Sequence, residues 1–194
     1  MKKILISILF VTTIFAQVEK KSIAILDFTS NGVSQSEAIA LTERLRNELF
    51  RLDTFAIYER GKMIEIMNEQ GFQQSICTTS DCAVEIGKLI GVKMIVTGSI
   101  NSLGDLLTIS TRIINVESGK IEKVTDFDYN RPPVGIFNTK KSRDGEALEY
   151  IMKSGMKFVA KQLVGKVSDY KMKHSPGTII IRDKKKDTES SVSR

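Results

Sequence analysis

The sequence predicts an α/β domain: a mixed β-sheet with βαβ crossovers, a carboxy-proximal antiparallel hairpin and flanking helices. In the first half of the chain, short apolar runs typical of buried strands alternate with segments of helical periodicity. Two longer segments with partial alternation follow at 106–116 and 121–129, and residues 117–120 (ESGK) between them are typical of a hairpin turn. A mixed sheet with helices on its faces buries the apolar side of every one of these elements.

Three strands and three helices are predicted in the first half of the chain. The strands are expected at 22–28, 55–58 and 94–100. The helices are expected at about 35–52, 63–68 and 81–90. Ser34 and Glu37 have the spacing of a capping box at the start of the first helix. Asp81 is the expected cap of the third helix, which Gly91 ends.

The chain is expected to have three parts. Residues 1–16 are predicted to be a signal peptide, and residues 17–165 a single α/β domain whose last helix spans about 144–164. Residues 166–194 form a basic polar tail that we expect to be partly disordered. Within the tail, residues 178–181 form a short β-like run.

The amino terminus has the pattern of an export signal. Lys2 and Lys3 precede an apolar run at 4–15, and Ala16 provides a small residue for cleavage before Gln17. The apolar run is shorter than the ~20 residues that a spanning helix needs. A buried strand and an uncleaved anchor are the alternatives. No cysteine directly follows the apolar run, so no lipid anchor is expected.

The net charge of +6 comes from the two ends of the chain. Residues 17–165 hold 19 basic and 19 acidic side chains, whereas residues 166–194 hold 8 and 4. A nucleic-acid-binding domain carries its positive charge on the fold itself. The charge distribution therefore argues against nucleic acid as a partner.

Few residues have the spacing of a catalytic or binding site, and neither a cofactor nor a metal site is expected. The chain has one histidine and two cysteines, too few for a zinc site without carboxylates. Cys77 and Cys82 are interpreted as a disulfide, with free thiols and a redox pair as alternatives. Asp27 and Gly98, in predicted strands of the parallel part, are candidate ligand contacts. Asp27 also fits a turn or cap, and Gly98 a bulge or close packing.

Several sequence strings, in this order and spacing, resemble the curli production assembly/transport component (CsgG-type) family and the related TolB amino-terminal-like domains. They are IAILDF at 23–28, ALTERLR at 40–46, YER at 58–60, EQGF at 69–72, CAVEIGKLIGV at 82–92, IVTGSI at 95–100 and RIINVESGKI at 112–121.

The resemblance implies a CsgG-like domain over residues 17–165 in an exported, non-catalytic envelope protein. It implies action through protein–protein contacts in outer-membrane or periplasmic assembly or secretion, such as curli assembly. The expected partners are envelope proteins and further copies of the chain in an oligomer, with peripheral membrane association at most. The expected location is the periplasm, with association to the outer membrane. The alternative is a small-ligand-binding periplasmic α/β module.

We predict that Cys77 and Cys82 are joined in the mature protein, because an exported chain with only these two cysteines favours pairing. Closing so small a loop contributes on the order of 2 kcal/mol in the chain-entropy model. Non-reducing peptide mapping of protein from its native compartment should show the bridge. Two freely alkylated thiols would contradict it.

Deleting residues 182–194 should leave the melting temperature within about 2 °C of the full chain. The segment holds one strongly apolar residue, Val192, against eight charged residues, so burial cannot offset its ordering entropy. Thermal unfolding followed by circular dichroism measures the change. A much larger drop would show that the segment docks on the fold.

Overall fold

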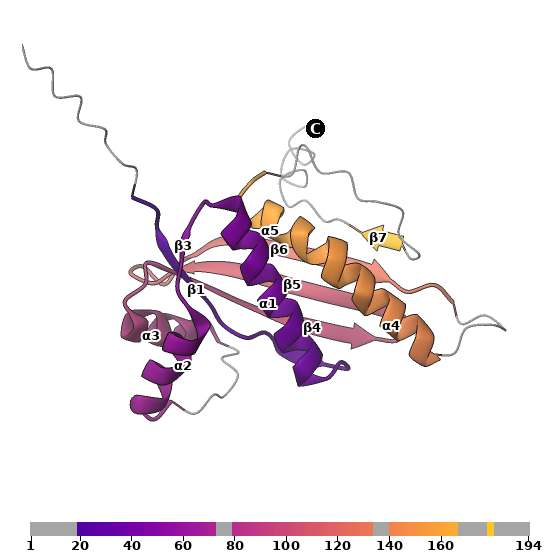
Figure 1. Cartoon of the computed structure of the whole chain (residues 1–194), viewed down its shortest axis with the longest axis horizontal. Helices are drawn as coiled ribbons and strands as arrows, with labels where there is room; N and C mark the ends of the chain where they lie inside the picture. Colours follow the sequence, from indigo (N-terminus) through magenta and orange to yellow (C-terminus); the bar gives the residue numbers. More distant parts are fainter. Residues whose placement is uncertain (1–18, 73–78, 134–139, 167–177, 181–194) are drawn as a thin grey trace, which may run out of the picture.

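The computed structural model describes residues 19–72, 79–133, 140–166 and 178–180 (Figure 1). Within these residues seven strands form one sheet in the order β3-β1-β4-β5-β6-β7, and β2 pairs with β4 beside this path. The strands are β1 (Ser22–Ile25), β2 (Thr29–Asn31), β3 (Ala56–Ile57), β4 (Met94–Leu103), β5 (Leu106–Asn115), β6 (Ile121–Asn130) and β7 (Thr178–Ile180). The helices are α1 (Gln35–Leu52), α2 (Arg60–Glu69), α3 (Ser80–Ile90), α4 (Lys140–Tyr150) and α5 (Met156–Leu163).

The sheet is mixed, as predicted. β1 pairs in parallel with β3 on one side and with β4 on the other, so α1 and the α2–α3 pair lie in crossover connections. β4, β5, β6 and β7 are antiparallel neighbours. Gly104 opens the two-residue β4–β5 turn with a φ of 57°, which suits the first central position of a type II′ turn.

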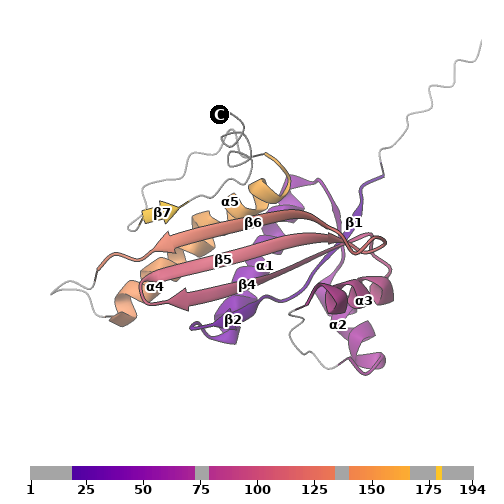
Figure 2. The same ribbon diagram turned by 180° about the vertical axis from the view of Figure 1, so that it is seen from behind.

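Helices cover the two faces of the sheet unequally. In Figure 1, α1 and the α4–α5 helix cross one face, and between them and the strands lies the larger core, which includes Phe28, Leu45 and Phe158. Seen from behind, α2 and α3 cover the other face only near β1 and the adjoining end of the hairpins (Figure 2). Their smaller core includes Met63 and Ile95. The rest of this second face has no described helix over it.

Three helices begin differently from the prediction, and one of them is α4, which starts at Lys140, four residues before the predicted start near residue 144. α3 is capped by Thr79, not Asp81, and the Thr79 hydroxyl accepts the N–H of Cys82 at 3.3 Å. Asp81 lies in the first turn, where its charge suits the helix dipole. α2 is longer than predicted because the Glu59 carboxylate caps it, accepting the N–H groups of Gly61 and Lys62 at 2.8 and 2.7 Å. These bonds lower the pKa of Glu59 below its usual value.

The last helix is interrupted by a π-helical turn at Ile151–Gly155 that the sequence did not reveal. A Cβ on Gly155 would lie 3.1 Å from the ring of Phe127, so the turn brings the helix close to β6. Beyond this turn, Val159 and Leu163 are buried as predicted.

Parts of the sequence-based interpretation lie outside the described residues: the signal peptide, the tail apart from residues 166 and 178–180, and Cys77. The β-like run predicted at 178–181 forms β7 over its described residues. No helix in the described ranges has both the length and the apolar character needed to cross a bilayer.

A one-residue bulge separates β1 from β2. Ile25 pairs with Val96 and Thr29 with Ser99, so residues 26–28 lie opposite only two residues of β4. The bulge places the ring of Phe28 against Gly98. A Cβ at Gly98 would lie 2.8 Å from that ring and 2.5 Å from a backbone oxygen of β5. Of the two alternatives predicted for Gly98, close packing is therefore confirmed. The bulge lies instead at residues 26–28, opposite Gly98.

Replacing Gly98 by alanine should destabilise the protein by about 1–3 kcal/mol, because neither the backbone oxygen nor the packed ring can move freely. Urea unfolding of wild type and variant measures the change. Gly145→Ala is the matched control, since this exposed helical glycine has nothing within 4 Å of an added Cβ. The control should be neutral or up to about 1 kcal/mol more stable. Equal stability of the two variants would contradict the prediction.

Candidate functional site

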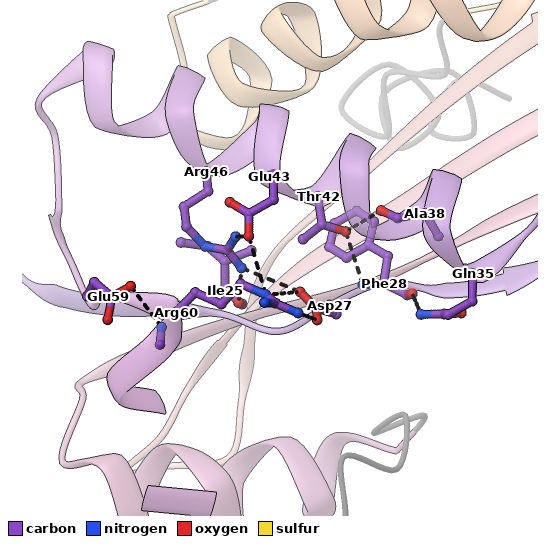
Figure 3. A network of polar contacts seen from close by, with 11 residues as sticks. Ile25, Asp27, Phe28, Gln35, Ala38, Thr42, Glu43, Arg46, Glu59 and Arg60 are labelled. Carbon is purple, nitrogen blue, oxygen red and sulfur yellow. Dashed lines mark hydrogen bonds and ion pairs between the residues drawn. The ribbon is translucent and has the colours of Figure 1, made fainter. Parts of the chain in front are cut away.

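Charged side chains from three elements meet where the chain leaves β1 (Figure 3). Asp27 lies on the bulge, and its carboxylate accepts two bonds from Arg60, the first residue of α2. The Nε–Oδ1 distance is 3.0 Å and the Nη2–Oδ2 distance is 2.5 Å. This fork geometry gives charge-assisted bonds with a fixed direction. The hydrogen bond to Asp27 raises the pKa of Arg60 above its ordinary value.

Arg46 of α1 completes the cluster from the other side. Its Nη2 donates to the carbonyl of Ile25 at 2.8 Å and lies 3.7 Å from Asp27 Oδ1. Its Nη1 is 2.6 Å from Glu43 Oε1, and the same oxygen is 3.3 Å from the Nε of Arg60. Two guanidinium groups are thus balanced by two carboxylates within the chain. We call Asp27, Glu43, Arg46 and Arg60 the ionic cluster.

One stripe of polar side chains on α1 satisfies the backbone of the bulge. The N–H of Phe28 donates to the Thr42 hydroxyl at 3.1 Å, and the carbonyl of Phe28 accepts from Gln35 Nε2 at 3.1 Å. Together with Arg46 on Ile25, these residues are spaced seven and four positions apart, which places them on one side of the helix. Backbone groups that leave a ladder need such partners when they are buried.

A hollow of about 570 Å³ opens beside the ionic cluster, between α1 and the segment that joins β3 to α2. Its uncharged lining comes from Asn47 and Phe50 of α1 and from Ile57 and Tyr58. The hollow therefore adjoins the carboxyl end of β3. In open α/β sheets this end of the parallel strands is where ligands commonly bind.

Asp27 and Gly98, the two candidate ligand contacts predicted from the sequence, have different neighbours in the structure. Asp27 points to Arg60, whereas Gly98 lies against the Phe28 ring. Gly98 also lines a second hollow of about 360 Å³ on the open face of the sheet, together with Ser99 and Ser110. Whether Asp27 or Gly98 contacts a ligand stays a prediction.

The described residues do not test the predicted disulfide, and they contain no group of side chains suited to a metal ion. Cys77 lies outside the described residues, and Cys82 lies in the first turns of α3, so their bond stays a prediction. In the part of the chain that is described, no three His, Cys, Asp or Glu side chains are grouped to hold a metal ion.

Arg46 and the polar stripe on α1 were not predicted from the sequence. Arg46 is only 7% exposed and Thr42 is fully buried. The sequence does contain a pattern that could have indicated this stripe, because Gln35, Thr42 and Arg46 lie at a helical spacing beside the apolar stripe. Their partners are backbone groups, however, which no side-chain motif reveals.

A second ionic cluster lies at the β4–β5 turn, beyond the carboxyl end of β4. Arg131 Nη1 donates to Ser102 Oγ at 2.9 Å, and Arg143 Nη1 donates to Asp105 Oδ1 at 2.5 Å. Asp144 lies 3.3 Å from Arg131 Nε and 3.5 Å from Arg143 Nη2. These bonds fix the β4–β5 turn, beside which Leu103 is 82% exposed.

A double-mutant cycle of Asp27→Asn and Arg60→Gln should give a coupling energy of about 1–2 kcal/mol in urea unfolding, because the pair is bidentate and partly buried. The exposed i,i+4 pair Glu149–Lys153 is the control. Its coupling should be about 0.3–0.5 kcal/mol. A coupling between Asp27 and Arg60 no larger than the control would refute a structural role for the ionic cluster.

Solved structures that resemble the chain share little sequence with it. The C-terminal domain of LpoB from Salmonella enterica is 17% identical, with 60% of this chain and 87% of that chain covered and a TM-score of 0.49. The lipoprotein GNA1162 from Neisseria meningitidis is 10% identical, with 69% and 94% covered and a TM-score of 0.49. A PelC dodecamer from Paraburkholderia phytofirmans is 12% identical, with 74% and 88% covered and a TM-score of 0.39.

A comparison with curated proteins finds no match for the chain. The family model described as the curli production assembly/transport component CsgG, in contrast, matches residues 12–111, more than half of the chain. The matched range includes β1, the bulge and all four residues of the ionic cluster. The chain belongs to the CsgG family, and it is an envelope protein of the CsgG type.

Proposed function

We propose that the protein is a non-catalytic component of the periplasm that acts through contacts with other envelope proteins in assembly or secretion. The observation that carries this proposal is the family match, since the family is described as an assembly/transport component. Further copies of the chain in an oligomer are among the proposed partners. The export pattern at residues 1–16 supports the periplasmic location that we propose.

The described surface offers support for action by contact. Phe50 is 71% exposed and Leu103 is 82% exposed, at separate places on the fold. Both lie beside ionic clusters whose charges have partners within the chain. Exposed apolar side chains on a rigid frame favour protein contacts, because little side-chain or loop order has to be gained on binding.

Affinity capture from envelope fractions tests the proposal. The tagged full chain is expressed in its native host, cross-linked in intact cells and recovered from the envelope. An exported, tagged protein of unrelated fold is the control. We expect specific enrichment of envelope proteins, or of untagged copies of the chain, over that control. Enrichment of neither would contradict the proposal.

A small-ligand-binding module is the second candidate, and the hollow at the carboxyl end of β3 is the observation that favours it. Three of its charged lining residues, Glu43, Arg46 and Arg60, are already paired with one another and with Asp27, and the fourth, Glu59, caps α2. A charged ligand would have to compete with these pairs. Native mass spectrometry of protein from the envelope distinguishes the two candidates, since a tightly retained small molecule would favour this one.

A further inference from the structure

We propose that the hollow between α1 and β3 binds a short, extended and uncharged apolar segment of a partner protein. The segment would pair with the outer edge of β3 and place an apolar side chain against Phe50. This inference rests on the proposed function, and it names the surface and the chemistry of the contact.

The outer edge of β3 is open to a further strand. β3 ends the strand order of the sheet, and no other described strand lies beyond it. The N–H of Ala56 donates to the carbonyl of Lys21, the residue before β1, at 3.1 Å. The N–H of Tyr58 donates to the carbonyl of Ile23 in β1 at 2.8 Å. Because successive residues of a strand direct their backbone groups to opposite sides, the N–H and carbonyl of Ile57 point outward. An exposed edge of this kind is a template for strand addition.

An aromatic anchor lies beside this edge. Phe50, on the last turns of α1, is 71% exposed and lines the hollow together with Ile57 and Tyr58. A partner side chain that enters the hollow therefore meets apolar surface from both the helix and the strand. Aromatic residues in such places supply much of the binding energy of an interface.

The charges of the hollow favour an uncharged occupant. Arg46 and Arg60 are neutralised by Asp27 and Glu43, as Figure 3 shows. The Glu59 carboxylate accepts two backbone N–H groups at the start of α2. A partner side chain that pairs with the ionic cluster would need to break one of its internal bonds, which is unfavourable. The exposed Glu59 carboxylate keeps its negative charge, so an anionic partner side chain is disfavoured most. Backbone pairing and apolar burial are left as the source of affinity.

The start of α2 limits the length of the paired segment. The carbonyl of Glu59 accepts the N–H of Met63 at 3.1 Å as the helix begins, so it is not available to a new strand. The partner therefore pairs over a short stretch around Ile57. Residues that alternate along the segment would face the hollow.

Peptides selected from a random displayed library against the full chain test this proposal. We expect uncharged sequences with alternating apolar residues. Phe50→Ser should weaken their binding about tenfold or more, as loss of a central aromatic anchor does. Leu103→Ser, which removes a similarly exposed side chain at another part of the fold, should leave binding unchanged.

Methylation of the peptide backbone tests the strand pairing without altering the protein. N-methyl groups on the alternate amides that face β3 should abolish binding. N-methyl groups on the intervening amides should leave it intact, because those amides point away from the edge. Equal loss from both sets would overturn strand addition, and so would peptides that bind Phe50→Ser as tightly as wild type.

Other occupants of the hollow give results that overturn the proposal. Self-association that Phe50→Ser abolishes, with no peptide bound, would assign the hollow to a second copy of the chain. A small molecule retained by wild type and lost in Phe50→Ser would assign it to a ligand. Envelope capture undiminished by Phe50→Ser would overturn this inference and leave the proposed function standing, whereas absence of capture by wild type would overturn the proposed function.

Discussion

The backbone groups that the bulge removes from the ladder between β1 and β4 need partners, and α1 provides them. A buried N–H or carbonyl without a partner costs about 1–3 kcal/mol. Gln35 and Thr42 meet this need at Phe28, and from the same side of the helix Arg46 binds the carbonyl of Ile25, which faces the β3 side of β1. Because all three bonds must form together, they fix the rotation of α1 over the sheet. The same rotation places Phe50 beside the edge of β3.

The ionic cluster joins the two layers of the domain. Arg46 belongs to α1, which packs on the larger core, whereas Arg60 begins α2, which packs on the smaller core. Asp27 lies between them on the bulge and contacts both guanidinium groups. Residues 53–59 connect the two helices through β3, so the cluster also fixes how this edge strand enters α2. Its charges pair with one another, so the cluster forms a rigid side of the adjoining hollow and carries no net charge itself.

Local signals were predictable from the sequence, and non-local ones were not. The capping box of Ser34 and Glu37 was predicted and is present, because both partners lie within one turn. The hairpin of β5 and β6 was predicted from partial alternation and turn residues, whereas the antiparallel pairing of β4 with β5 was not. The bulge adds a single residue and leaves no periodic signal. The π-helical turn depends on the fit of Gly155 to Phe127, which only the folded chain brings together. At the candidate site, Asp27 was identifiable from its place at a strand end, whereas its arginine partners lie 19 and 33 positions away.

Each of the two ionic clusters lies beside an exposed apolar side chain and fixes the backbone next to it. One fixes the edge beside Phe50, and the other fixes the turn beside Leu103. A partner that buries either side chain meets a backbone that is already held in place, so little conformational entropy is lost on binding. The arginines near both anchors are occupied, which disfavours partners that would bring unmatched charge. In the contact proposed at β3, selectivity would therefore come from shape and backbone pairing, and charge would act mainly to keep the frame rigid.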